Sequence, residues 1–273
     1  MARREFHGRV VVVTGAAGGL GRALAARFAA AGARVALLDR DAAAVEAAAA
    51  GLGQAALGLA CDVSDAVQCE RALARAAAAL GPVHVLINNA GISHRSAYAA
   101  TDPAVIRRVM EVNFFGAVHC TRAALDDLAR TRGLIVTISS VAGFSPLIAR
   151  TGYAASKHAL HGFFDSLRTE LADSGIDVLL VCPAFIATGI ERNALGGDGA
   201  PARHAQRVVG VRAAPDAVAD EIYEAARRGR RLLLHGRTAR LAWWLSRFAP
   251  GLYARLMARR LRGEMRGETD RGA

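Results

Sequence analysis

Tyr153 and Lys157 stand four residues apart, and Ser140 precedes the tyrosine by thirteen residues. On a helix, this spacing places the tyrosine and the lysine on one face, about one turn apart. A phenol has an unperturbed pKa near 10, and a neighbouring ammonium favours its phenolate form. A tyrosine tuned in this way can give or take a proton near neutral pH. The pair therefore predicts acid–base chemistry, although an exposed tyrosine beside a solvated lysine would have the same spacing.

Lys157 is the only lysine among the 35 basic residues of the chain. The composition thus favours arginine, and a lysine that persists in it marks a place where arginine does not substitute. Guanidinium is a planar fork with a permanent charge, whereas ammonium is a compact charge with three donors. We therefore interpret Lys157 as a functional position.

Length and composition restrict the class of protein. A chain of 273 residues with 53% hydrophobic and 22% charged residues fits one large α/β domain. No apolar run approaches the length of a membrane span, and the run Val10–Val13 is too short for a signal-peptide core. The four cysteines lack metal-ligand spacing, and the eight histidines form no ligand-spaced cluster. We expect reduced, buried thiols, no metal site and a cytoplasmic protein.

The predicted strands are short apolar runs that alternate with helical segments. The strands cover residues 9–14, 34–38, 56–61, 83–88, 134–138, 176–182 and 231–235. The helices cover residues 22–31, 42–52, 65–80, 103–130 with a bend near Asn113, 153–174 and 215–228. This alternation predicts an α/β fold with a doubly wound parallel sheet, the Rossmann fold. We expect a single domain over residues 1–240 and a basic amphipathic C-terminal helical extension over residues 241–273.

Polar, glycine or proline residues stand at or just past the ends of six of these strands. They are Gly15, Asp39, Asp62, Asn88, Ser140 and Pro183. Because ligands bind outside the carboxyl ends of the strands in such sheets, these positions predict a binding site at one edge.

The turn from Thr14 to Gly21 is rich in glycine and joins the first strand to the first helix. Such a turn lets backbone N–H groups and a helix N-terminus face a pyrophosphate, although an ordinary strand-to-helix turn can also be rich in glycine. Asp39 follows about 20 residues later, where an acid can bind ribose hydroxyls and repel a 2′-phosphate. Arg40 could attract that phosphate instead, so these residues alone leave the cofactor open.

At this point the chain resembles the short-chain dehydrogenase/reductase family over residues 6–236. The matching motifs are Thr14-Gly15-x-x-x-Gly19-x-Gly21, Asp62-Val63, Asn88-Asn89-Ala90-Gly91, Asn113, Ser140, Tyr153-x-x-x-Lys157 and Pro183-x-x-x-x-Thr188. Each is modest alone, but all seven in order are specific. The chain departs from the family at Pro183-Ala184, where Pro-Gly is usual.

The resemblance implies a role for each catalytic residue. Tyr153 would be the general acid/base, and Ser140 would hold the substrate oxygen. Lys157 would lower the tyrosine pKa and bind the nicotinamide ribose, while Asn113 would support a water chain. The same resemblance implies a set of cofactor-binding residues: Gly15, Gly19, Leu20, Gly21, Asp39, Arg40, Asp62, Val63, Asn89, Ala90, Gly91, Tyr153, Lys157, Pro183, Ile186 and Thr188.

The resemblance predicts an oxidoreductase that interconverts a secondary alcohol and a ketone. Asp39, together with a non-basic Gly18, favours NAD(H), while Arg40 leaves NADP(H) open. Phe144, Phe185 and Ile186 favour an apolar substrate, and we expect a homodimer or homotetramer. One alternative is a 3-oxoacyl-thioester reductase, because Arg192, Arg203 and Arg207 could meet a phosphorylated carrier. Another is a non-catalytic nucleotide-binding protein.

The C-terminal segment has its own character. Residues 227–273 contain 13 arginines and three acidic residues, so almost all of the net charge of +11 belongs to them. Leu241, Trp244, Leu245 and Phe248 recur at the spacing of one helical face, and Pro250-Gly251 ends that pattern. This interleaving of apolar residues and arginines is more typical of a lipid surface or a protein partner than of nucleic acid. Residues 241–262 are therefore predicted either to cap an apolar substrate entrance or to touch a membrane peripherally.

Overall fold

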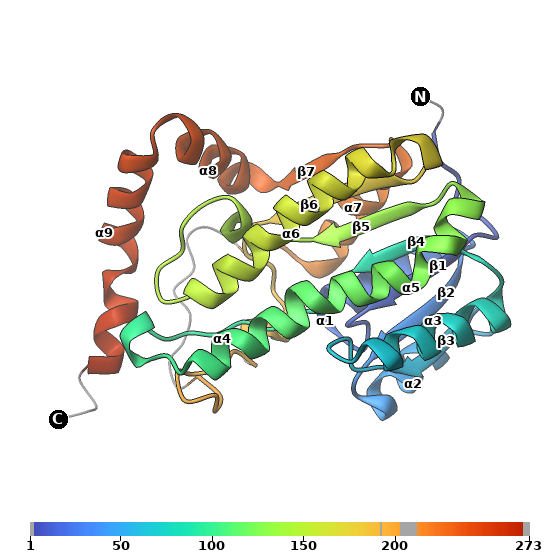
Figure 1. Ribbon diagram of the computed structural model, residues 1–273, viewed down its shortest axis with the longest axis horizontal. Helices are drawn as coiled ribbons and strands as arrows, with labels where there is room; N and C mark the ends of the chain where they lie inside the picture. Colours follow the sequence, from blue (N-terminus) through green and yellow to red (C-terminus); the bar gives the residue numbers. More distant parts are fainter. Residues whose placement is uncertain (1–2, 192, 203–211, 270–273) are drawn as a thin grey trace.

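The predicted parallel sheet is confirmed. The computed structural model describes residues 3–191, 193–202 and 212–269. Its seven strands are β1 (Val10–Thr14), β2 (Arg34–Asp39), β3 (Ala56–Ala60), β4 (Val83–Asn88), β5 (Leu134–Ile138), β6 (Asp177–Pro183) and β7 (Leu232–His235). They run parallel in the order β3-β2-β1-β4-β5-β6-β7 (Figure 1). Strands β2 and β3 are added on one side of β1, and β4 to β7 are added on the other side, as in a doubly wound sheet.

Two layers of helices cover the sheet and explain why the strands are almost continuously apolar. The helices are α1 (Gly19–Ala30), α2 (Ala42–Ala50), α3 (Ala66–Leu80), α4 (Pro103–Met110), α5 (Gly116–Thr131), α6 (Thr151–Glu170) and α7 (Pro215–Arg227). α1, α2 and α7 pack on one face, where Val11 and Val13 point. α3, α5 and α6 pack on the other, where Val12 points. Alternate residues of β1 therefore enter two separate cores.

The predicted bend near Asn113 is a π-helical turn. Residues Glu111–Phe115 form this turn between α4 and α5. α4 begins at Pro103 behind the N-cap Asp102, whose carboxylate accepts from the Ala104 N–H at 2.8 Å. The extra residue of a π turn changes the direction of the side chains that follow it, and such turns are frequent at functional sites.

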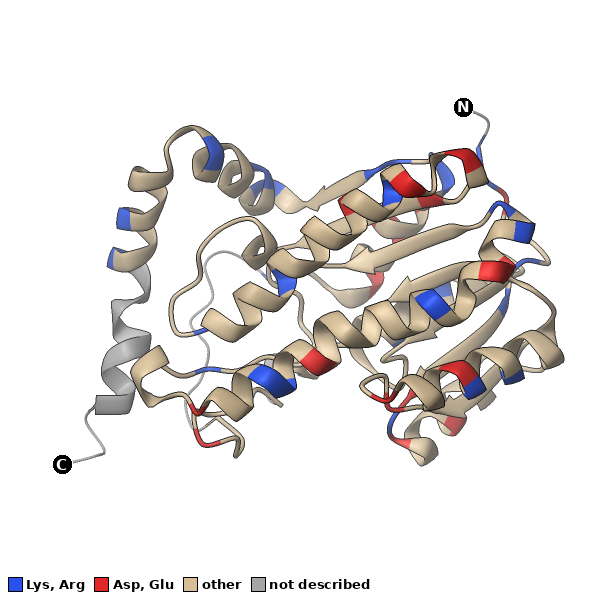
Figure 2. Ribbon diagram, in the orientation of Figure 1, with Lys and Arg blue, Asp and Glu red and all other residues tan. Residues whose placement is uncertain are grey.

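Two further helices, α8 (Gly236–Phe248) and α9 (Pro250–Thr269), extend beyond the sheet at one end of the molecule (Figure 1). The predicted break at Pro250 is confirmed as the start of α9. On the coloured part of this pair, Figure 2 shows basic but no acidic residues, and residues 236–259 contain neither aspartate nor glutamate. No helix in the described ranges combines the length and apolarity needed to cross a membrane.

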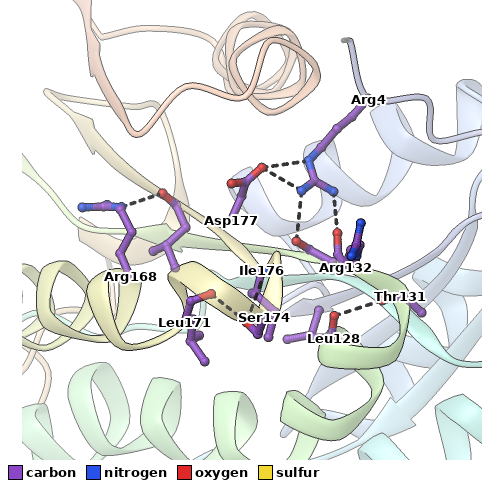
Figure 3. A network of polar contacts seen from close by, with 11 residues as sticks. Arg4, Leu128, Thr131, Arg132, Arg168, Leu171, Ser174, Ile176 and Asp177 are labelled. Atoms are coloured by element: carbon purple, nitrogen blue, oxygen red, sulfur yellow. Dashed lines mark hydrogen bonds and ion pairs between the residues drawn. The ribbon is translucent and has the colours of Figure 1, made fainter. Parts of the chain in front are cut away.

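The amino ends of β5 and β6 are tied to the N-terminal segment by Arg4 (Figure 3). Its guanidinium donates to Asp177 Oδ2 at 2.7 Å and to the carbonyls of Arg132 and Gly133 at 3.0 and 3.2 Å. Arg132 ends α5 in the left-handed conformation, with φ of 48°. At this edge, charged and polar groups are used to hold chain segments together.

Candidate active site

A cavity of about 990 Å³ opens at the carboxyl edge of the sheet. Its walls include nearly all the residues that the sequence placed there: Gly15, Gly19, Leu20, Asp39, Arg40, Asp62, Val63, Asn89, Ala90, Gly91, Ser140, Tyr153, Lys157, Pro183, Ile186 and Thr188. Gly21 and Asn113 lie behind these walls. The structure thus brings together residues separated by more than 170 positions in the chain.

The glycine-rich turn passes very close to the segment that follows β4. Gly15 has φ of +64°, and a Cβ there would come within 2.8 Å of the Ala90 Cα. At Gly21 a Cβ would lie 2.1 Å from the Gly15 carbonyl oxygen. Asn89 fixes this approach because its Nδ2 donates to the carbonyls of Thr14 and Gly15 at 2.9 and 3.1 Å. Only glycine fits these two places.

The N-terminus of α1 faces the cavity and has the form of an anion site. Its N-cap residue is Gly18, and no side chain caps the helix. A Cβ at Gly18 would meet nothing within 4 Å, which leaves room for a ligand against the backbone. Uncapped N–H groups and the helix dipole favour a phosphate group there. This cradle fits the pyrophosphate of a dinucleotide.

Asp39 and Arg40 stand together at the end of β2, where the adenosine half of such a ligand would lie. The Asp39 carboxylate accepts from the backbone N–H groups of Ala17 at 3.1 Å and Asp41 at 3.2 Å. It is therefore held in a fixed orientation beside the glycine-rich turn. Arg40 is exposed at the cavity wall. Both Asp39, which can bind ribose hydroxyls, and Arg40, which can bind a 2′-phosphate, therefore lie at the cavity wall.

Ser140, Tyr153 and Lys157 lie near the opposite end of the cavity. α6 carries the tyrosine and the lysine one turn apart, and the Lys157 Nζ is 5.7 Å from the Tyr153 ring centroid. The Lys157 ammonium donates to the Ile138 carbonyl at 2.9 Å. Ser140 follows β5, and its Oγ accepts from the Ala142 N–H at 3.1 Å. These contacts fix the positions of Lys157 and Ser140, which both lie close to Tyr153.

Burial affects the pKa values of Tyr153 and Lys157 more than neighbouring charges do. It raises the pKa of Tyr153, although a side-chain hydrogen bond with Ser140 and the charge of Arg150 act in the opposite direction. Burial also lowers the pKa of Lys157 to about 8. The sequence predicted a lowered tyrosine pKa, and the chain by itself gives the opposite direction because desolvation opposes the phenolate. The resting tyrosine is therefore a protonated acid.

Asn113 connects the segments around Tyr153 and Lys157. From the π-helical turn, its Oδ1 accepts from the Ile92 N–H at 2.7 Å. Its Nδ2 donates to the Ile92 carbonyl and to Ser156 Oγ, both at 2.9 Å. This buried amide joins the segment after β4 to α6, next to Lys157. A water chain through Asn113 stays a prediction.

His94 positions the helix that carries Tyr153, and the sequence reasoning missed it. Its buried Nε2 accepts from the Gly152 N–H at 2.9 Å, in the first turn of α6. Burial lowers the pKa of His94 to about 4, so the ring is a neutral acceptor. His94 therefore caps the helix that carries Tyr153, while the N-cap residue Arg150 supplies no side-chain cap. The separation of 58 positions between donor and acceptor gave no local signal.

Two buried arginines, Arg95 and Arg150, also line the cavity. They are 6% and 3% exposed, so the wall near Tyr153 is charged as well as apolar. The expectation of an apolar substrate rested on Phe144, Phe185 and Ile186 and did not include these two arginines. Ala149, next to Arg150, has φ of 57°, a left-handed conformation that is unusual for alanine.

The segment after β6 closes one side of the cavity. The Pro183-Ala184 turn needs no glycine, because neither residue has a positive φ. Beyond it, Leu195 lines the cavity and pairs with Ser93 and Arg95 through backbone hydrogen bonds of 2.8 and 2.7 Å. Part of the chain that follows the Pro183-Ala184 turn is thus packed against residues 93–102. Arg192, Arg203 and Arg207 lie outside the described residues.

Comparison with known proteins identifies the family. The family model for "short chain dehydrogenase" matches residues 9–197, which is more than half of the chain. This chain belongs to the short-chain dehydrogenase/reductase family. The resemblance inferred from the motifs is therefore confirmed, together with the fold.

Several short-chain dehydrogenases/reductases are similar over nearly the whole length. The bovine "Dehydrogenase/reductase SDR family member 7B" is 41% identical over 97% of this chain and 85% of that protein. The Anopheles gambiae "Dehydrogenase/reductase SDR family protein 7-like" is 37% identical over 94% of this chain and 84% of that protein. This similarity therefore continues past residue 197 into the C-terminal part.

Two solved structures of the family share the fold. A short-chain dehydrogenase/reductase from Burkholderia phymatum in complex with NAD has a TM-score of 0.82 and 27% identity, over 91% of this chain and 96% of that one. A 3-ketoacyl-(acyl-carrier-protein) reductase from Brucella melitensis, complexed with NADH, has a TM-score of 0.73 and 26% identity, over 84% of this chain and 96% of that one.

Proposed function

We propose that this protein is an oxidoreductase that uses NAD(H) to interconvert a secondary alcohol and a ketone with a largely apolar body. The observation that carries the proposal is the cavity itself. One end is a glycine-lined cradle for a pyrophosphate, and the other holds Ser140, Tyr153 and Lys157. Both cofactor and substrate can therefore reach the tyrosine from the same space.

The bound nicotinamide would supply or accept the hydride, and the chain supplies position, charge and a proton. Ser140 would hold the substrate oxygen by a hydrogen bond that strengthens as negative charge develops on it. Tyr153 is in the protonated form that can give a proton to this oxygen. The Lys157 ammonium, held by the Ile138 carbonyl, would hold the ribose and stabilise the phenolate after the proton leaves. His94 and Asn113 position α6 and the segment after β4.

The preference for NAD(H) rests on Asp39. Its carboxylate is held by two backbone N–H groups in the cradle, where a ribose 2′-hydroxyl can be bound and a 2′-phosphate is repelled. Arg40 is exposed and not fixed in this way by any described hydrogen bond. The two solved neighbours are complexes with NAD and NADH, which supports the same preference. Titration of both reduced cofactors by fluorescence tests it, and tighter binding of NADPH would refute it.

The proposed substrate has an apolar body and a polar end. Leu195, Leu241 and Leu245 line the cavity, while Arg95 and Arg150 place positive charge in its wall. A panel of ketones with graded chain length, with and without an acidic group, tests this proposal by cofactor turnover. We expect kcat/KM to rise with chain length, and to rise further with the acidic group. The panel should include a 3-oxoacyl thioester, since a strong preference for it would assign the alternative function.

A further inference from the structure

The pair α8–α9 presents apolar side chains to the outside. Eight large hydrophobic side chains are exposed among the described residues, and five of them lie on this pair: Leu241, Trp244, Phe248, Leu252 and Leu256. Trp244 is 60% and Phe248 75% exposed, and their rings stack with centroids 5.2 Å apart. The apolar stripe predicted from the sequence therefore faces outward for most of its length. A concentration of this kind marks an interaction surface.

Arginines surround this apolar stripe, and residues 236–259 include no acidic residue. The exposed arginines of residues 236–259 are Arg237, Arg240, Arg247, Arg255 and Arg259. That segment contains no aspartate or glutamate, and Figure 2 shows only basic residues along it. The five apolar side chains and these five arginines together are called the α8–α9 surface below. The side chains of Arg260 and Arg262 lie outside the described set.

The charge selects the kind of partner. If two copies paired through this surface, each would bring its arginines towards those of the other, and like charges would repel. An anionic lipid surface supplies the opposite charge and an apolar interior. Amphipathic helices with large apolar residues and arginines lie in such an interface.

The same surface is continuous with the active-site cavity. Leu241 and Leu256 line the cavity, yet they are 61% and 38% exposed. Specific contacts hold the helices over the catalytic side. The buried Tyr253 hydroxyl donates to Ser145 Oγ at 3.0 Å, and Trp243 packs edge-on against Phe144 with centroids 4.8 Å apart. The mouth of the cavity therefore opens beside the exposed apolar residues.

We propose that the α8–α9 surface docks on an anionic membrane, with the helices lying in the interface and the cavity mouth turned towards the lipid. Docking itself is independent of the proposed activity. The entry of apolar substrate from the lipid rests on the proposed function. The α8–α9 pair would then both cover the cavity and dock on the membrane.

Co-sedimentation of the full chain with vesicles tests this proposal. We expect binding to vesicles of phosphatidylcholine with phosphatidylserine at low salt, and much weaker binding to phosphatidylcholine alone or at high salt. Trp244→Ser with Phe248→Ser should lower the partition coefficient at least about tenfold, because two large apolar side chains no longer enter the interface. Arg240→Gln and Arg255→Gln should each lower it about fivefold.

Matched control variants lie on α3, far from this surface in sequence. Val67→Ser removes another exposed apolar residue, and Arg71→Gln with Arg75→Gln removes two exposed arginines. These controls should leave the partition coefficient unchanged. All variants should retain the turnover of a small water-soluble ketone, because none of the altered side chains lines the cavity. If the Trp244 and Phe248 variant does not fold, the arginine variants still test the proposal.

Two outcomes would overturn docking. One is equal recovery of wild type in the supernatant with and without anionic lipid. The other is a dimer in light scattering that dissociates in the Trp244 and Phe248 variant, with no vesicle binding, which would assign the surface to a second copy. If the protein binds vesicles but reduces no ketone in the panel, the proposed function fails while docking stands.

Discussion

The amino edge and the carboxyl edge of the sheet both carry polar and charged residues, but these residues have different roles at the two edges. At the amino edge, the Arg4 guanidinium binds Asp177 and two backbone carbonyls, and chain segments are held together. At the carboxyl edge, Ser140, Tyr153 and Arg40 line an open cavity. Because all strands are parallel, the loops that follow the strands all lie at the carboxyl edge, where ligands bind in such sheets. Substitutions at the two edges should therefore separate activity from stability.

Tyr153→Phe should have the largest effect on activity. The change removes the proton donor, and we expect kcat to fall by about 10²- to 10⁴-fold. Cofactor affinity and the melting temperature should stay close to wild type, since the ring remains. Tyr98→Phe, at a tyrosine that is 70% exposed, is the matched control and should be silent. Turnover of the Tyr153 variant within about threefold of wild type would remove this residue from the mechanism.

Lys157→Arg should also lose activity, by a factor on the order of 10². The ammonium is buried against the Ile138 carbonyl, and a Cβ at Gly91 would be only 3.6 Å from its Nζ. A wider guanidinium would disturb this packing as well as the charge geometry. Steady-state kinetics together with cofactor titration checks the prediction. Unchanged kcat with arginine would mean that any cation suffices there.

His94 links the carboxyl edge to pH-dependent stability. Its pKa is about 4 in the folded chain and near 6.5 for an unperturbed histidine, so the unfolded chain binds the proton first as the pH falls. The stabilising effect of the neutral ring is present above pH 6.5 and is lost between pH 6.5 and 4. Between about pH 7 and pH 5 we expect a loss of about 2 kcal/mol from this group.

Denaturant unfolding at the two pH values, for wild type and His94→Gln, measures the contribution. The glutamine keeps an acceptor for Gly152 but does not titrate. His161→Gln is a parallel variant, because burial lowers its pKa to about 4 as well. An identical pH dependence in wild type and His94→Gln would contradict a neutral, buried His94.

Arg4→Ala should give the smallest effect, and only on stability. The side chain of Arg4 is 25% exposed and that of Asp177 is 50% exposed, so solvent screens their ion pair. With the two carbonyl contacts included, we expect a loss of about 1 kcal/mol in the free energy of unfolding. Arg3→Ala, at an exposed neighbour, is the matched control. A change in kcat with Arg4→Ala would break the separation between the two edges.

The sequence revealed the features that depend on local pattern. The apolar runs located the strands within one or two residues, and strand direction then placed Asp39, Ser140 and Pro183 at one edge. Pro103 marked a helix start because a proline fits the first turn of a helix, and Pro250 marked the break between α8 and α9. Even the bend near Asn113 was visible, as an interruption in a long helical pattern.

Features that depend on tertiary packing could not be predicted in this way. The role of His94 requires a donor 58 positions away, and the burial of Arg150 follows from the packing around α6. The direction of the Tyr153 pKa shift depends on how deeply the ring is buried. Similarly, the apolar period of α8 predicted a helix, but only the structure shows that its stripe faces outward.

The most direct test of the central claim follows the hydride. An apolar ketone from the panel is incubated with NADH deuterated at the transferable position of the nicotinamide, and the product alcohol is examined by mass spectrometry and NMR. We predict one deuterium on the carbinol carbon with wild type, and at least about 10²-fold slower formation of this product with Tyr153→Phe. Binding of NADH without deuterium transfer to any ketone or thioester of the panel would contradict the claim that this site is an alcohol–ketone oxidoreductase.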